Sequence, residues 1–229
     1  MADIGLVLRK QQSKLGEALT KKTHFSVMEI ENLLNLYRKL SVGIDIDRLD
    51  RTRFREFLHN AFDMTDDILL DRIFKFFDDD NDGFISREEW ILGLSVFMKG
   101  KSCYYIFVRY RNTISKHLMA GNEEELIKYC FDIYDLNGDG MISREEMLNM
   151  LKTSLGRQGM DEDPDEGVKD LIDMTLRKLD KDKDGKVSFK DWSTTVRQEP
   201  LMMEAFGPCL PSKRQGALFM QKVESDYMN

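Results

Sequence analysis

The chain has 229 residues, of which 41% are hydrophobic and 33% are charged, and its net charge at pH 7 is -7. This composition is typical of one or two globular domains. The acidic balance argues against binding to nucleic acid or to an anionic membrane, because both require clustered positive charge. No apolar run in the sequence is long enough to cross a bilayer.

The first residues and the cysteines indicate where the chain would reside. The N-terminus lacks a basic region followed by an apolar core, so no secretory signal is expected. Residue 2 is Ala instead of Gly, which excludes the usual myristoylation signal, and we expect no membrane anchor. The three cysteines are scattered and odd in number, which favours a reducing compartment over a disulfide framework. We therefore expect a location in the cytoplasm or on the cytoskeleton.

The first predicted elements are two helices, Ser26–Leu40 and about Thr52–Phe62, on either side of the segment Val42–Arg53. This segment has the spacing of a loop that recurs three times further along the chain. Its twelfth residue, Arg53, would repel a cation, and its first, third and fifth residues are apolar. We interpret the segment as a degenerate copy that pairs with the next loop and binds no metal. The apolar residues at its would-be ligand positions are Val42, Ile44 and Ile46.

The segment Asp78–Glu89, DDDNDGFISREE, is the first copy with a complete set of oxygen ligands. In a twelve-residue calcium loop, positions 1, 3, 5 and 12 supply side-chain oxygens, position 7 supplies a carbonyl, and a glycine at position 6 permits a sharp turn. Gly83 occupies the sixth position, and apolar residues recur at helical spacing on both sides. The predicted ligands are Asp78, Asp80, Asp82, the carbonyl of Phe84, and Glu89.

The second complete copy is Asp135–Glu146, DLNGDGMISREE, which also lies between two helical patterns. Gly140 occupies the turn position, and Ser143 at position 9 would act through water. Both complete copies end in S-R-E-E, which is the capping-box pattern at the start of a helix. The predicted ligands are Asp135, Asn137, Asp139, the carbonyl of Met141, and Glu146.

The third copy, Asp180–Asp191, reads DKDKDGKVSFKD and differs at its last position. Asp191 stands where the other two loops have Glu, and Asp is one methylene shorter, so it reaches an ion with fewer oxygens. A contracted shell suits magnesium better than calcium, and the lysines of this loop weaken its negative field. We expect this site to be the weakest for calcium and to accept magnesium. The predicted ligands are Asp180, Asp182, Asp184, the carbonyl of Lys186, and Asp191.

A helix–loop–helix unit with this loop is the EF-hand, and EF-hands normally occur in pairs. The predicted fold is all-α, with four such units, the first degenerate, in two lobes that each hold a short β-bridge between paired loops. Residues 1–99 form the N-terminal lobe, with the degenerate hand and the first calcium-binding hand, and residues 123–198 form the C-terminal lobe with two calcium-binding hands. Residues 100–122 form a linker or insertion, and residues 199–229 form a tail. The expected cofactor is calcium, with two strong sites and one weaker site.

Two segments do not fit the repeat. Residues 101–122 are aromatic and mildly basic, and we weigh three interpretations: a linker that extends a helix, a partner-docking element, and the product of an unusual transcript. The segment Pro200–Pro211, PLMMEAFGPCLP, is unusually apolar for a tail. It would either fold back over a hydrophobic groove or form part of a partner surface.

Three short segments outside the loops carry a more specific resemblance. AFDMTDD (61–67), DPDEG (163–167) and EAFGPCLP (204–211) resemble segments of the calaxin family, EF-hand proteins of ciliary and flagellar axonemes. The likeness runs from about residue 20 to residue 211, and residues 101–122 depart from the family's short connection. The resemblance implies a calcium-responsive regulator of axonemal dynein. Its implied partners are a dynein heavy chain or proteins of the outer-arm docking complex.

The leading hypothesis is therefore a calcium sensor of the cilium or flagellum that is a monomer by itself. The alternatives are a neuronal-calcium-sensor-like regulator of a membrane or enzyme partner, a regulatory subunit of a phosphatase or kinase, and a cytosolic calcium buffer. The sequence has no phosphate-binding glycine loop, zinc cluster or nucleophile motif, so we do not expect an enzyme.

Overall fold

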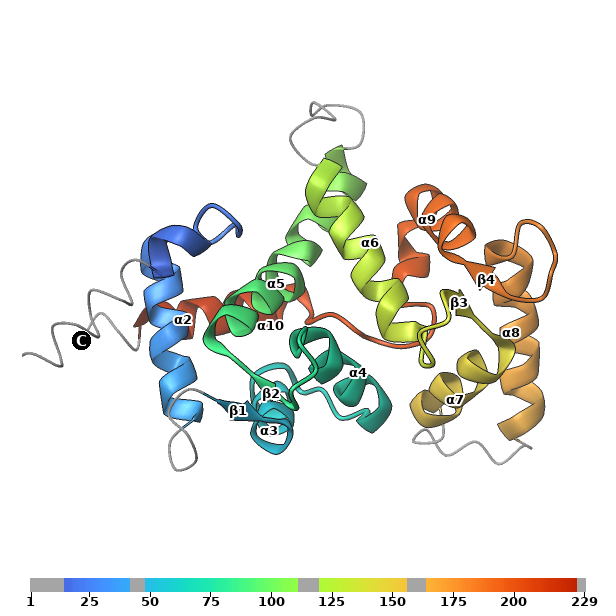
Figure 1. Cartoon of the computed structure of the whole chain (residues 1–229). Helices are drawn as coiled ribbons and strands as arrows, with labels where there is room; N and C mark the ends of the chain where they lie inside the picture. Colours follow the sequence, from blue (N-terminus) through green and yellow to red (C-terminus); the bar gives the residue numbers. More distant parts are fainter. Residues whose placement is uncertain (1–14, 42–47, 111–119, 156–163, 226–229) are drawn as a thin grey trace, which may run out of the picture. The chain divides into compact units, whose positions relative to one another are not determined.

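The computed structural model describes residues 15–41, 48–110, 120–155 and 164–225, and it consists of helices with two small strand pairs (Figure 1). The prediction of an all-α fold built from paired EF-hands is confirmed. In chain order the elements are α2 (Val27–Leu40), β1 (Leu49–Asp50), α3 (Arg51–Phe62), α4 (Asp67–Phe77), β2 (Phe84–Ile85), α5 (Arg87–Tyr110), α6 (Ala120–Tyr134), β3 (Met141–Ile142), α7 (Arg144–Leu155), α8 (Pro164–Leu179), β4 (Val187–Ser188), α9 (Phe189–Gln198), a 3₁₀ helix η1 (Pro200–Glu204) and α10 (Lys213–Ser225).

The chain forms two compact units that do not follow chain order. Unit 1 contains residues 1–64, 77–99 and 211–229, and unit 2 contains residues 65–76 and 100–210. The division passes through α4, because most of this helix belongs to unit 2, whereas Phe77 and the loop that follows belong to unit 1. The last helix, α10, belongs to unit 1 although it follows unit 2 in the sequence.

In unit 1, the strands β1 and β2 join the degenerate copy to the first complete loop. Leu49 pairs with Ile85, so the eighth positions of the two copies lie opposite each other. Both are fully buried because this position faces the core. The indole Nε1 of Trp90, directly after the first complete loop, donates to the carbonyl of Leu33 on α2 at 3.1 Å. The degenerate copy therefore serves as the pairing partner of the first loop.

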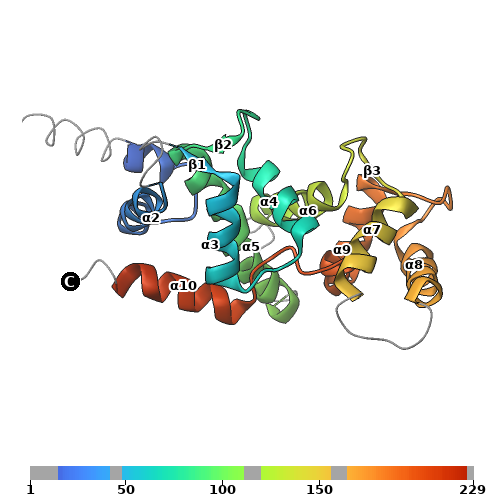
Figure 2. The ribbon, with the colours of Figure 1, turned by 90° about the horizontal axis from the view of Figure 1, so that it is seen from below.

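The apolar face of α10 packs against α2 and α3 within unit 1 (Figure 2). The ring centroid of Phe219 lies 5.7 Å from that of Phe57 and 5.2 Å from that of Phe62. The side-chain amide of Gln215 donates to the carbonyl of Phe62 at 2.7 Å, which satisfies a backbone acceptor at the end of α3. A cavity of about 540 Å³ remains between these three helices.

Unit 2 repeats the same plan. Ile142 pairs with Val187, again at the eighth positions of two loops. Trp192 follows the third loop as Trp90 follows the first, and its Nε1 donates to the carbonyl of Ile127 on α6 at 3.0 Å. The repeated indole hydrogen bond shows that the two units are built on the same internal frame.

The segment after α9 folds back onto unit 2 and completes its core. Phe206 is fully buried and stacks on Trp192, with ring centroids 6.4 Å apart. The hydroxyl of Tyr134 donates to the carbonyl of Gly207 at 2.6 Å, and that of Tyr129 donates to the carbonyl of Cys209 at 2.9 Å. Burial raises the pKa of both tyrosines well above their ordinary value, so both remain protonated donors. Of the two interpretations of this segment, the structure supports folding back.

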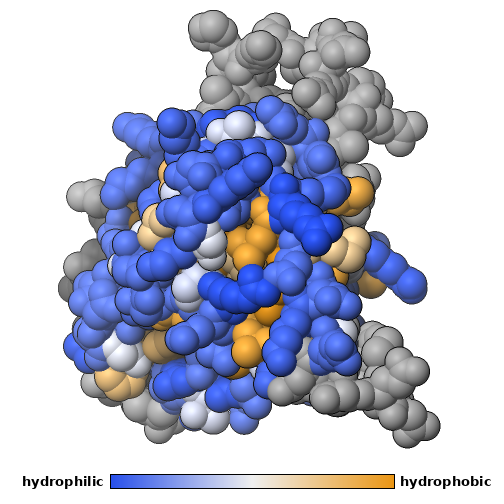
Figure 3. Space-filling model, turned by 90° about the vertical axis from the view of Figure 1, so that its right-hand side faces the viewer, coloured by the Kyte–Doolittle hydropathy of each residue, from blue (hydrophilic) through white to orange (hydrophobic). Residues whose placement is uncertain are grey.

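One face of the molecule, on the side that bears α8, shows a narrow apolar strip among hydrophilic side chains (Figure 3). On α8, the large apolar side chains of Leu171 and Met174 are 36% and 63% exposed. Among the described helices, none is both long enough and apolar enough to cross a membrane.

The aromatic segment 101–122 is described only in part. Its first residues continue α5 as far as Tyr110, so this portion is helical. The side chains of residues 99–122 and the backbone of residues 111–119 lie outside the described part of the chain, and so do the ligand positions of the degenerate copy at 42–46. The docking interpretation of the segment therefore stays a prediction.

Candidate metal sites

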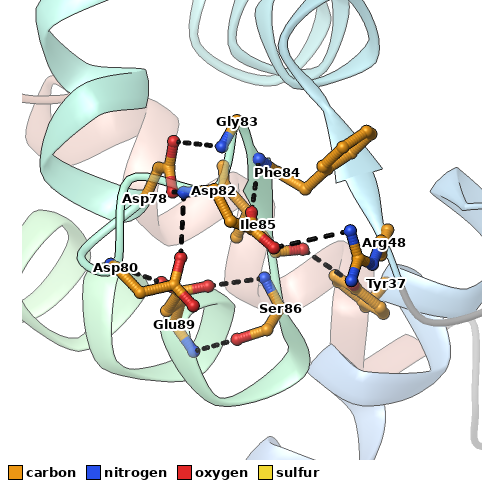
Figure 4. Close-up of polar contacts among 10 residues, drawn as sticks. All are labelled: Tyr37, Arg48, Asp78, Asp80, Asp82, Gly83, Phe84, Ile85, Ser86 and Glu89. Atoms are coloured by element: carbon orange, nitrogen blue, oxygen red, sulfur yellow. Dashed lines mark hydrogen bonds and ion pairs between the residues drawn. The ribbon is translucent and has the colours of Figure 1, made fainter.

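Three aspartates converge in the first complete loop, between the end of α4 and the start of α5 (Figure 4). Asp78, Asp80 and Asp82 each offer a carboxylate oxygen, and these oxygens all lie within 4.8 Å of one another. Oxygens bound to one calcium ion at about 2.3–2.6 Å lie at most about 5 Å apart. The cluster therefore has the dimensions of a shell around a single calcium ion.

Glu89 closes this loop from the first turn of α5. Its Oε1 accepts hydrogen bonds from the backbone N–H groups of Asp79 (3.0 Å) and Asp80 (3.2 Å), at the beginning of the loop. Its Oε2 accepts from the N–H of Ser86 at 2.7 Å, and Ser86 Oγ accepts from the N–H of Glu89 at 3.4 Å. The predicted capping box is thus present, and it holds the carboxylate of position 12 beside the aspartates.

All three loops share one backbone turn. The sixth-position glycines Gly83, Gly140 and Gly185 have φ values of 85°, 83° and 86°, in the left-handed region that glycine adopts at little cost. The N–H of each glycine donates to the first aspartate of its own loop, at 3.0, 2.8 and 2.9 Å. This turn directs the first-position carboxylate toward the centre of each loop.

The second loop has the arrangement of the first. Asp135 is 5% exposed, and its carboxylate accepts from the N–H groups of Gly138 and Gly140 at 2.8 Å each. Glu146 Oε1 accepts from the N–H of Asn137 at 3.0 Å, and its Oε2 accepts from the N–H of Ser143 at 2.7 Å. The carboxylate of position 12 therefore again spans the loop from its third to its ninth position.

The third loop also brings its aspartates together, but its last residue lies differently. Asp180, Asp182 and Asp184 each offer an oxygen within 4.8 Å of the others. The carboxylate of Asp191 accepts from the hydroxyl of Ser188 at 2.7 Å. Within this loop, which is described in full, it accepts no hydrogen bond from the backbone at the loop's beginning, as the two glutamates do. The missing methylene accounts for this difference.

Repulsion between carboxylates appears in the pKa values of the loops. Burial raises the pKa of Asp78 above its ordinary value, and the carboxylates of Asp82 and Glu89 raise it further, although two backbone N–H groups oppose them. The pKa of Asp182 is raised by desolvation and then by the carboxylate of Asp184. A cation held among these groups favours their charged forms, so the donor chemistry fits a hard divalent ion.

Arg48 is a component of the first site that the sequence analysis did not identify. It directly precedes β1, and its guanidinium lies 3.5 Å from Asp82 Oδ2 and 5.3 Å from the ring centroid of Phe84 (Figure 4). Its position beside the pairing residue Leu49 was the available signal, because pairing brings the two loops together. The arginine of the degenerate copy therefore places a positive charge next to a predicted ligand.

We expect Arg48→Gln to raise the calcium affinity of the first loop about two- to fivefold, because exposed ion pairs contribute about 0.2–1 kcal/mol. The affinity is measured by a calcium titration that follows the amide resonance of Gly83, which bonds Asp78 in this loop. Lys22→Gln is the matched control, because Lys22 pairs with Glu88, which is not a predicted ligand. An unchanged titration of Gly83 in Arg48→Gln would show that Arg48 does not compete with the ion.

Replacing Asp191 by Glu is expected to strengthen calcium binding at the third loop relative to magnesium. The longer side chain gains the reach that Glu89 and Glu146 have, and the larger shell suits calcium. The measurement is a competition titration of the two ions that follows the Gly185 amide. No gain in calcium preference would mean that position 12 does not limit this site.

Comparisons with known proteins agree with this geometry. A model of the EF-hand domain pair matches residues 124–192, and a model of the EF hand domain matches residues 69–97. The chain is 47% identical to calaxin of Bos taurus over 225 residues, which cover 95% of this chain and 96% of that protein. It is 49% identical to calaxin of Xenopus laevis over 212 residues, which cover 90% and 91%. It is also 32% identical to a type 2 calcineurin subunit of Bos taurus over 175 residues, which cover 76% and 86%. The chain therefore belongs to the calaxin family of EF-hand calcium-binding proteins.

Proposed function

We propose that this chain is a calcium sensor of cilia or flagella that regulates outer-arm dynein. It binds a dynein heavy chain or proteins of the outer-arm docking complex as a monomer, and it has no catalytic role of its own. The observation that carries the proposal is the set of converging loop carboxylates in a chain 47% identical to a calaxin over 95% of its length. The first two loops are the strong calcium sites, and the third is a weaker site that also takes magnesium.

The helices after the loops are the parts that would respond to calcium. When bound, calcium supplies a divalent charge at the centre of each loop. Glu89 and Glu146 lie on the first turns of α5 and α7, so a shift of either carboxylate turns the helix that carries it. In sensor EF-hands such turning exposes apolar surface rich in methionine. The exposed Leu171 and Met174 of α8 are apolar side chains to which a partner segment would bind.

The proposal is tested by affinity capture from axonemal extract, with calcium and with chelator, followed by identification of the retained proteins. A second bait carries Glu89→Gln and Glu146→Gln, and a matched third bait carries Glu88→Gln and Glu145→Gln. We expect dynein heavy chain or docking proteins to be retained in a calcium-dependent amount by the wild type and the matched bait. The second bait should lose that dependence. Retention of no axonemal protein under either condition would overturn the ciliary assignment.

The likeness to the type 2 calcineurin subunit supports a second candidate, a regulatory subunit of a phosphatase. The same capture tests it, because this candidate expects a phosphatase catalytic chain among the retained proteins. A calcium buffer would differ from both candidates, since buffers barely open on binding. An absent rise in hydrophobic-dye fluorescence on adding calcium would favour the buffer.

A further inference from the structure

Arg72 of α4 makes an unusually dense set of hydrogen bonds within unit 2. Its Nε donates to the carbonyl of Ile133 at 3.3 Å, and its Nη1 donates to the carbonyl of Leu136 at 3.1 Å. Its Nη2 donates to the carbonyls of Asp132 and Asp135. One side chain therefore holds four acceptors at the junction of α6 and the second loop.

These carbonyls need an external donor because of where they lie. The last four carbonyls of a helix have no partner within the helix, and α6 ends at Tyr134. The other two acceptors are the backbone carbonyls of positions 1 and 2 of the second loop. The planar guanidinium has five donors in a fixed arrangement, so it can bind several carbonyls at once, as an ammonium group cannot. Arg72 thus determines where the first ligand residue, Asp135, enters its loop.

The charge of Arg72 is retained in this setting. Burial lowers the pKa of its guanidinium below the ordinary value, and the carboxylates of Asp135, Asp132 and Glu146 raise it. A second contact joins the same two helices, because the rings of Phe76 and Tyr129 meet edge to face with centroids 4.6 Å apart. α4 is therefore attached to α6 at two points.

The other end of α4 leads into the first calcium loop. Phe77 is its last residue, and Asp78, the first predicted ligand, follows directly. Arg72 lies six residues before Asp78, or about 9 Å along a rigid helix at about 1.5 Å per residue. Any turn of α4 caused by binding at the first loop therefore moves the group that anchors the beginning of the second loop.

We propose that Arg72 couples the first and second calcium loops, so that calcium at either loop strengthens binding at the other. This inference rests on the calcium-binding part of the proposed function and not on its dynein partner. The helix α4 is the shared element, since it supplies the anchor of one loop and the entry to the other. Linkage requires the coupling to be reciprocal and equal in both directions.

The test is a double-mutant cycle on the full chain, with calcium as the titrant. Each loop has its own reporter, because the amide of Gly83 bonds Asp78 and the amide of Gly140 bonds Asp135. We expect Glu89→Gln to raise the calcium concentration for half-saturation at Gly140 about fivefold or more, within the usual range of allosteric coupling. Glu146→Gln should raise that at Gly83 by the same factor. In an Arg72→Met background both factors should fall to about one.

Two further variants separate coupling from a purely structural role. Arg72→Lys keeps the charge but loses the multiple donors, so it should also lose most of the coupling. Arg144→Gln removes another cation near the second loop, one paired with Asp173 on an exposed surface, and should leave the cycle unchanged. If Glu89→Gln affected Gly140 equally with Arg72 and with Met, Arg72 would be only a structural anchor and the proposal would fail. A wild-type chain that bound no calcium at either loop would overturn the calcium-binding function itself, together with the coupling.

Discussion

Glu146→Gln should weaken calcium binding at the second loop on the order of 100-fold, while the fold is retained, because calcium loops tune affinity strongly through ligand charge. The side chain of Glu146 is 5% exposed, and its two oxygens lie at opposite ends of the loop. Gln keeps the shape but loses the charge and one of the two oxygens. The same argument applies to Glu89→Gln at the first loop.

Calorimetry with calcium measures this change as the loss of one strong site. Glu145→Gln is the matched control, because Glu145 is the exposed neighbour of Glu146 and is not a predicted ligand. The control should keep every site of the wild type. An unaltered number of sites in Glu146→Gln would contradict the ligand assignment of the second loop.

Phe206→Ala is expected to destabilise unit 2 by about 3–5 kcal/mol, the usual cost of removing a buried Phe side chain. Phe206 is fully buried between Trp192 and Tyr134, although it lies beyond the last EF-hand in the sequence. Urea unfolding measures the loss. It is done in chelator, because bound calcium would add stability of its own.

The control for this prediction is Leu201→Ala, a change in the same segment at a side chain that is 87% exposed. We expect it to change stability by no more than about 0.5 kcal/mol. The chain has two tryptophans, one in each unit, so a Trp90→Phe background leaves Trp192 as the only indole reporter of unit 2. Equal stability of Phe206→Ala and Leu201→Ala would mean that the segment after α9 is not part of the core.

The sequence predicts the calcium loops well because their information is local. A loop of twelve residues contains its own ligands, its turn glycine and the cap of the next helix. Gly83 and Gly140 have the positive φ that the template requires, and Glu89 and Glu146 lie beside the beginnings of their loops. The same locality made the pairing predictable, because an apolar eighth position has to be buried against another.

The contacts that the sequence could not predict join residues far apart in the chain. The burial of Phe206 in unit 2 and the return of α10 to unit 1 depend on which apolar faces the EF-hand pairs leave uncovered. Arg72 and Arg48 read as ordinary charged residues of a helix and of a degenerate loop. Their roles arise when folding places Arg72 against the carbonyls of α6 and Arg48 against Asp82. A loop pattern specifies an ion site by itself, whereas the groups that modulate the site depend on how distant elements pack.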